Sequence, residues 1–188
     1  MTDVISNLVN ALKAITAEDS EPATIIARVK PEVAKVVQDA SWLKPEYYEF
    51  DAEQGMGINI LNQEEDGTIL VEVISWGPGR GVAPHDHQTW GVVVGIDGVE
   101  INVDWQRLDD GSRPGFAVLE KARETEVRKG DVVALLPDDI HSVRNEGDTP
   151  SLSLHMYGKA LAKVERSEFD PTNKTQRPCP QRVRKLTG

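Results

Sequence analysis

The chain has 188 residues, of which 39% are hydrophobic, and a formal net charge of −10 at pH 7. This length and composition suit a single domain, residues 1–188, with a sizeable core. Because the chain is so acidic, we expect neither nucleic acid nor an anionic membrane surface as a partner.

No apolar run approaches the roughly 18 residues of a membrane helix, and residues 1–4 lack the basic region of a signal peptide. We therefore expect a cytoplasmic protein. The single cysteine, Cys179, cannot form an internal disulfide, which agrees with a reducing compartment. No feature of the sequence indicates an oligomeric state.

Residues 1–45 show helical periodicity. Apolar residues recur at helical spacing at Val4, Leu8, Leu12 and Ile15. Pro22 follows Ser20 and Glu21 and predicts the first turn of a second helix. Since proline is unfavourable inside a helix, Pro31 predicts that a third helix begins there. We expect these helices to pack as a layer against the outside of a β-domain.

From about residue 56 the pattern changes to short β-branched and alternating runs. They cover residues 58–61, 69–76, 90–96, 99–105, 117–119, 132–136 and 151–157. Glycine-containing turn pairs separate many of them, at 66–67, 97–98, 110–111 and 129–130. Many short strands with tight turns predict a mainly β fold, a sandwich or a barrel.

The four histidines of the chain all lie in this β region, at His85, His87, His141 and His155. On a strand, residues i and i+2 project from the same face, so His85 and His87 can offer two imidazoles to one ion. A third ligand must come from elsewhere, and His141 is the candidate. The alternative is a surface pair and a core histidine. Histidines alone suit iron, zinc, nickel or copper equally.

The surroundings of these histidines resemble the two motifs of the cupins. Gly79, five further residues, His85-Asp86-His87 and a later Gly98 resemble the first motif. The second is similar to the stretch with Gly130, Pro137, His141 and Asn145. The resemblance covers residues 55–160 and implies a double-stranded β-helix, a jelly-roll-like barrel, with the N-terminal helices outside it.

One departure from the cupin pattern matters for the chemistry. The usual cupin supplies a glutamate four or five residues after the second histidine, where this chain has Gly91 and Val92. The implied ligand set is therefore His85, His87 and His141, without a carboxylate. Three neutral ligands leave the charge of a divalent ion uncompensated and leave positions open, which favours an anionic ligand such as a thiolate.

Ser153, His155 and Tyr157 share one face of the strand predicted at 151–157, so the hydroxyl can orient the imidazole and the imidazole the phenol. Beside a three-histidine site this series resembles the thiol dioxygenase family, which includes cysteine dioxygenase and bacterial 3-mercaptopropionate dioxygenase. The stretches 76–79, 90–91 and 166–170 are similar to the bacterial branch. Taken alone, the series would instead suit an ordinary strand with a solvated polar face.

The resemblance implies an enzyme that binds one Fe(II) per chain and oxidises a small thiol with both atoms of O2 to a sulfinate. Tyr157 would hydrogen-bond the substrate carboxylate or oxygen, His155 would hold its phenol, and Ser153 would fix the imidazole. We expect 3-mercaptopropionate as substrate, with cysteine or mercaptosuccinate as alternatives.

Two residues are candidates for binding the substrate. Asn59 stands where cysteine-selective relatives carry arginine and mercaptopropionate enzymes carry glutamine, and it leaves room for a longer thiol. Arg166, nine residues beyond Tyr157, is the candidate anchor for a carboxylate. Its alternative role is a surface pair with Glu165 or Glu168.

Residues 171–188 form a basic, proline-interrupted tail on the acidic body. It is either a solvated or surface-docked terminus or a cover that makes the pocket more positive. Two other functions stay open: a cupin sensor that holds a metal without turnover, and a three-histidine dioxygenase that cleaves carbon–carbon bonds in diketones or flavonols. The latter needs an apolar pocket, so a cation facing the metal distinguishes the classes.

Overall fold

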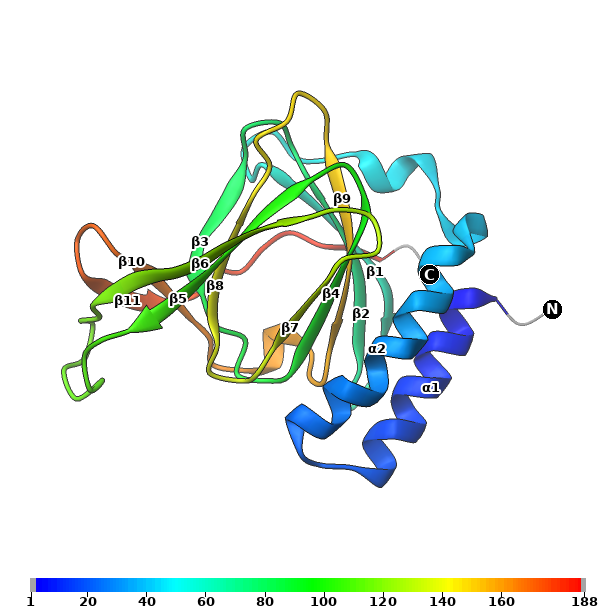
Figure 1. Cartoon of the computed structure of the whole chain (residues 1–188), viewed down its shortest axis with the longest axis horizontal. Coiled ribbons are helices and arrows are strands. Elements are labelled where there is room, and N and C mark those ends of the chain that lie inside the picture. Colours follow the sequence, from blue (N-terminus) through cyan, green and yellow to red (C-terminus); the bar gives the residue numbers. More distant parts are fainter. Residues whose placement is uncertain (1–2, 187–188) are drawn as a thin grey trace.

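The computed structural model describes residues 3–186, which form two β-sheets with a helical layer on one of them (Figure 1). The first sheet has the order β12 (Lys185–Leu186), β1 (Met56–Gln63), β2 (Leu70–Trp76), β9 (Ser151–Tyr157), β4 (Gly91–Asp97) and β7 (Val132–Leu135). The second has the order β11 (Thr175–Pro178), β10 (Ser167–Asp170), β3 (Gly81–His85), β8 (Ile140–Arg144), β5 (Glu100–Arg107) and β6 (Leu119–Val127). Neighbouring strands are antiparallel, except that β12 runs parallel to β1.

This strand order is that of a double-stranded β-helix, so the expected mainly β fold is confirmed. From β2 to β5 and again from β6 to β10, successive strands alternate between the two sheets, as where β3 joins one and β4 the other. Side chains that point inward from both sheets therefore meet in one interior. The strands with His85 and His141 belong to one sheet and β9 belongs to the other, which places their inward side chains across from each other.

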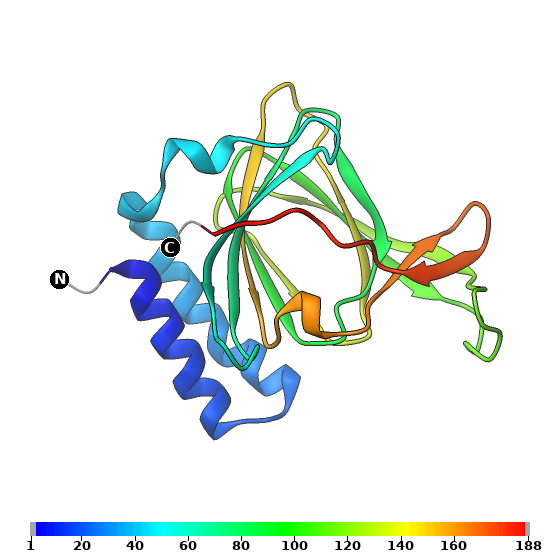
Figure 2. The ribbon, with the colours of Figure 1, turned by 180° about the vertical axis from the view of Figure 1, so that it is seen from behind.

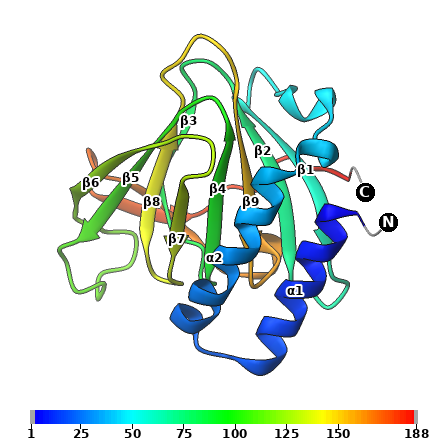
Figure 3. The same cartoon turned by 45° about the vertical axis from the view of Figure 1, so that its right-hand side comes forward.

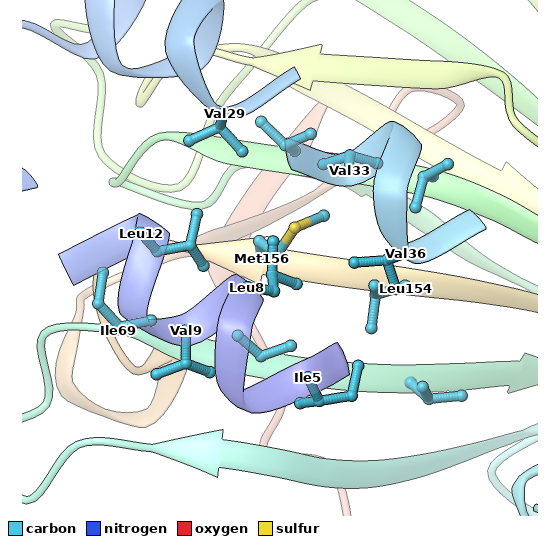
Figure 4. Close-up of a cluster of buried hydrophobic side chains, with 14 of the residues drawn as sticks. Ile5, Leu8, Val9, Leu12, Val29, Val33, Val36, Ile69, Leu154 and Met156 are labelled. Atoms are coloured by element: carbon cyan, nitrogen blue, oxygen red, sulfur yellow. The ribbon is translucent and has the colours of Figure 1, made fainter. Parts of the chain in front are cut away.

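The helical layer consists of α1 (Val4–Glu18) and α2 (Pro22–Gln38), which cover the outer face of the sheet that contains β2, β9 and β4 (Figure 3). Short 3₁₀ turns follow at η1 (Ala40–Trp42) and η2 (Pro45–Tyr48), and η3 (Leu161–Lys163) follows β9. Figure 4 shows Leu12 and Val33 from the helices meeting Leu154 and Met156 from β9. Fully burying one such side chain contributes about 1.5–3 kcal/mol.

The prediction that a third helix begins at Pro31 is wrong, because α2 continues through Pro31 to Gln38. Proline removes the hydrogen bond to the carbonyl four residues earlier, that of Ala27. Both residues are on the exposed side of the helix, where water can solvate that carbonyl. On the other side, Val29 and Val33 are fully buried and hold both halves of the helix on the sheet.

The alternation of side chains along β9 determines which residues pack against the helices and which point into the barrel. On β9, Leu152, Leu154 and Met156 point outward to the helices, so Ser153, His155 and Tyr157 point into the barrel. Every residue of β9 is buried. In the described part of the chain, no helix is long and apolar enough to cross a membrane.

Candidate metal centre

The three predicted metal ligands come together at one end of the barrel interior. His85 ends β3 and lies opposite His141 of β8 in the antiparallel register, and His87 follows two residues later. Their ring centroids are 4.7–5.0 Å apart in pairs, and their candidate ligand nitrogens all lie within 4.8 Å of one another. Sequence spacing supplied the first pair, and the β3–β8 register adds the third imidazole.

Hydrogen bonds orient two of the imidazoles for an ion. The Nδ1 of His141 lies 2.7 Å from Oδ1 of Asn102, and the Nδ1 of His85 lies 2.9 Å from the carbonyl oxygen of Ala83. Both oxygens accept, so each Nδ1 is the donor and each Nε2 is left for a metal. The Nε2 of His141 and the Nδ1 of His87 are buried without any partner. Unpartnered buried nitrogens need an explanation, and a bound metal ion provides one.

The electrostatics of the site favour the neutral imidazoles that a metal requires. Burial lowers the pKa of His85 to about 4. Burial, followed by the neighbouring imidazoles, also lowers the pKa values of His87 and His141 well below the ordinary value. Metal binding competes with protons for these nitrogens, so imidazoles that resist protonation are suitable ligands over a wide pH range.

The structure also explains the missing carboxylate. Gly91 of β4 lies directly opposite Tyr157 of β9. A Cβ atom at position 91 would lie 3.1 Å from two ring carbons of Tyr157, so a glutamate there would need the phenol to move. In residues 3–186, the group of side chains placed to hold an ion consists of the three histidines.

Ser153, His155 and Tyr157 form the hydrogen-bonded series that the sequence predicts. Ser153 Oγ lies 2.9 Å from His155 Nε2, and His155 Nδ1 lies 2.9 Å from the Tyr157 hydroxyl. All three are at most 2% exposed, so the alternative of a solvated polar face is excluded. The rings of Tyr157 and His87 have centroids 4.9 Å apart, which places the phenol at the histidine cluster.

Burial sets the protonation of this series. It lowers the pKa of His155 to about 3 and raises the pKa of the Tyr157 hydroxyl. At neutral pH the imidazole is therefore uncharged, and the phenol keeps its proton and can donate it in a hydrogen bond.

A cavity of about 50 Å³ opens beside the histidines and Tyr157. Its lining includes the apolar side chains of Ile58, Ile74 and Trp76. It also includes charged side chains, those of Arg166, Arg182, Arg184, Glu72 and Glu168. Because one water needs about 10–15 Å³ of such volume, the cavity suits a molecule of only a few heavy atoms.

Arg166 differs from the other two arginines of the cavity. Arg182 pairs with Glu168 at 3.5 Å and Arg184 with Glu72 at 3.2 Å. Within the described residues, Arg166 has no ion pair and its side chain makes no hydrogen bond, so the surface pairing with Glu165 or Glu168 is not formed. A cation without a partner thus faces the cavity.

The expectation that Asn59 binds substrate needs correction. Met56 and Ile58 of β1 line the cavity, so the alternate residue Asn59 points to the opposite face. It lies opposite Val73, whose side chain belongs to the core beneath the helices. A count along the chain without gaps selected a position one residue away from the inward face.

Comparison with known proteins gives likenesses of fold. No family model matches the chain. An oxalate oxidase solved with the substrate analogue glycolate has a TM-score of 0.46 and 16% identity over 62% of this chain, and the match covers 59% of that protein's length. A Klebsiella pneumoniae protein with a double-stranded β-helix domain has a TM-score of 0.49 and 15% identity, and the match covers 70% of this chain and 93% of that protein. A cupin domain of an Enterobacter cloacae transcriptional regulator has a TM-score of 0.39 and 20% identity, and the match covers 55% of this chain and 96% of that domain.

The basic tail takes the second of its two expected roles, a cover of the pocket, because Cys179, Arg182 and Arg184 line the cavity. One buried group of the interior was not found from the sequence. Glu100 of β5 is a buried carboxyl near Ser151 and Ser153, and burial raises its pKa to about 7. Together with the histidines, the tail residues line a cavity that has neutral candidate metal ligands, a phenol donor and a free cation.

Proposed function

We propose that the chain is an iron-dependent thiol dioxygenase that converts a small mercapto-carboxylate, with 3-mercaptopropionate as first candidate, to its sulfinate. The observation that carries the proposal is the placement of the Tyr157 phenol and the unpaired Arg166 around one cavity beside three neutral histidines. In the reaction RS⁻ + O2 → RSO2⁻, sulfur supplies four electrons, both oxygen atoms join it, and the thiol proton leaves when the thiolate forms.

The histidine set accounts for the affinity for a thiolate. An iron(II) ion held by His85, His87 and His141 would supply the redox chemistry between thiolate and dioxygen. Because the three imidazoles are neutral, they offset none of the charge of a divalent ion, and an anionic sulfur ligand is favoured. The chain's contribution is to hold these nitrogens in place and to position the substrate.

Arg166 and Tyr157 would bind the far end of the substrate. A guanidinium without a carboxylate partner can form a charge-assisted, bidentate hydrogen bond with the substrate carboxylate. When Ser153 donates to His155 Nε2, the Nδ1–H donates to the Tyr157 oxygen. The phenol proton is then available to the group in the cavity.

The cavity also separates this function from its alternatives. The charged side chains of its lining and its volume of about 50 Å³ suit a small anionic thiol better than a diketone or a flavonol, whose pockets should be apolar. A sensor that holds a metal without turnover would explain the histidines but gives no role to the series from Ser153 to Tyr157. Cysteine and mercaptosuccinate remain the alternative thiols.

The test begins with the metal content of the purified chain, including iron, manganese, zinc, nickel and copper. Oxygen uptake is then measured with 3-mercaptopropionate, cysteine, mercaptosuccinate and cysteamine, and the sulfinate is identified by its mass. We expect iron and one O2 consumed per sulfinate formed. Stoichiometric iron without oxygen uptake on any of these thiols would favour the sensor.

Arg166→Ala tests the anchor. A charge-assisted hydrogen bond is worth roughly 1.5–3 kcal/mol, so kcat/KM for 3-mercaptopropionate should fall about ten- to a hundredfold. Cysteamine has no carboxylate and should be scarcely affected. Arg123→Ala is the matched control, because Arg123 is an exposed arginine of β6 that pairs with Asp104. Equal losses for both thiols would remove Arg166 from substrate binding.

A further inference from the structure

Glu72 is a fully buried carboxylate in the wall of the metal cavity. It lies on β2 opposite His155 in the register and is 1% exposed. Its Oε2 accepts a hydrogen bond from Nε of Arg184 at 3.2 Å, while its Oε1 has no partner. The ion pair with Arg184 favours the ionised carboxylate, so the unpartnered Oε1 places negative charge at the ligand cavity.

The partner of Glu72 arrives from the other end of the chain. We use the term C-terminal strap for residues 179–186, which run from the β10–β11 hairpin across the barrel to β1 (Figure 2). The side-chain amide of Gln54 fixes the strap's backbone: Val183 N–H donates to Oε1 at 2.8 Å and Nε2 donates to the Val183 carbonyl at 3.3 Å. The strap is extended there, with Val183 exposed and Arg182 and Arg184 turned to the cavity.

The charges around the cavity can be counted. Its lining includes three guanidiniums, of Arg166, Arg182 and Arg184, and the two carboxylates of Glu72 and Glu168. The other polar side chains of the lining are those of the histidines, Tyr157 and Cys179. Burial raises the pKa of Glu72, while the guanidinium of Arg184 favours its ionised form. Glu168 is shared, because Arg177, which does not line the cavity, also pairs with it. Among the side chains that line the cavity, guanidiniums outnumber carboxylates by one.

We propose that the Glu72–Arg184 pair makes the cavity select substrates with one carboxylate and reject those with two. The inference rests on the proposed function and deepens it. Arg184 is occupied by Glu72 and cannot bind a second substrate carboxylate, and the free oxygen of Glu72 repels one. Arg166 remains as a single anchor, so Glu72 and the strap determine specificity although neither carries out chemistry.

The proposal predicts opposite effects from the two halves of the pair. Glu72→Gln removes the repulsion and frees Arg184, so binding of a dicarboxylate relative to a monocarboxylate should rise about tenfold, the scale of one charge-assisted contact. Arg184→Gln leaves Glu72 uncompensated and should weaken both ligands. The double variant Glu72→Gln/Arg184→Gln has a neutral pair and should return near the wild-type ratio.

The experiment uses simple carboxylates, so that it does not depend on catalysis. Binding of propionate and succinate to the metal-loaded full chain is measured by ligand-observed NMR for wild type and the three variants, with metal content and unfolding temperature as checks of folding. Lys185→Gln is the matched control, because Lys185 is an exposed cation of the same strap that pairs with Glu49 at the surface. It should leave the ratio unchanged.

A second arm compares kcat/KM for mercaptosuccinate and 3-mercaptopropionate in the same proteins. If wild type oxidises no thiol, the proposed function fails, while the propionate and succinate ratios still decide the charge selection. An unchanged succinate-to-propionate ratio in a folded, metal-loaded Glu72→Gln protein would overturn the proposal. So would a rise of the same size in Lys185→Gln, because the effect would then be one of overall charge.

Discussion

Glu100 offers a quantitative test of the barrel interior through the pH dependence of stability. It lies on β5, is 3% exposed, and its Oε1 has no hydrogen-bond partner. Burial raises its pKa from 4.5 to about 7, against smaller opposing effects of Ser153, Ser151 and Trp76. Glu100→Gln keeps the shape of the side chain and removes its proton equilibrium, so it isolates the energetic effect of ionising this carboxyl.

The sign follows from proton binding. Between pH 4.5 and about 7 the folded chain holds a proton on Glu100 that the unfolded chain has released. The contribution of this carboxyl to the free energy of unfolding is therefore fully present below pH 4.5 and is lost as the pH rises through about 7. At 1.36 kcal/mol per pKa unit, this interval corresponds to a loss of about 3 kcal/mol.

The assay is urea denaturation of metal-loaded wild type and Glu100→Gln across this pH range and above it. The stability of the variant relative to wild type should rise by about 3 kcal/mol between the acidic and the alkaline ends. Effects of pH on metal binding are common to both proteins and cancel in the difference. Glu120→Gln, at an exposed position of β6, should follow wild type. Parallel curves for wild type and Glu100→Gln would show that Glu100 ionises as freely as an exposed residue.

Three further predictions concern the metal centre. Tyr157→Phe should retain the metal and lower kcat about 100- to 1000-fold, because it removes one hydrogen-bond donor. His155→Ala should also lower kcat. If Tyr157→Phe turns over as fast as wild type, the series from Ser153 to Tyr157 has only a structural role. His141→Ala should lose the metal in elemental analysis, and stoichiometric binding with unchanged activity would refute the ligand set. Gly91→Ala places a methyl group 3.1 Å from the Tyr157 ring, so it should lower kcat while metal content stays constant.

The sequence predicts the histidine pair and the series from Ser153 to Tyr157 because their signals are local. The i, i+2 spacing of His85 and His87 and the alternation along β9 both follow from strand geometry, whatever the rest of the chain does. The same reasoning missed β6, where residues 120–126 are all exposed. An edge strand that buries almost nothing lacks an apolar alternation, and its pairing with β5 defines it instead.

A residue is assigned to the wrong face of a strand when the count along the chain is wrong by one position. Asn59 and Ile58 are neighbours in the sequence, yet one packs under the helices and the other lines the cavity. A strand has a period of two, so any insertion or deletion in the count from a related sequence moves a side chain to the wrong side. Pro31 is a different case, because its tolerance depends on which side of α2 meets water.

The pairing of the charges around the cavity could not be predicted from local pattern. In the sequence, Glu72 is an isolated acid in an apolar strand, and Arg184 is one of several cations in a basic tail. They are 112 positions apart, and their pairing requires the strap to return across the barrel and join β1 in parallel. Among the three arginines that line the cavity, Arg182 and Arg184 are paired and Arg166 is not. Which arginine is left to bind a substrate therefore depends on the whole fold. The substitutions at Glu72, Arg166 and Arg184 each change the net charge of the side chains that line the cavity, and the effect on ligand binding is what they measure.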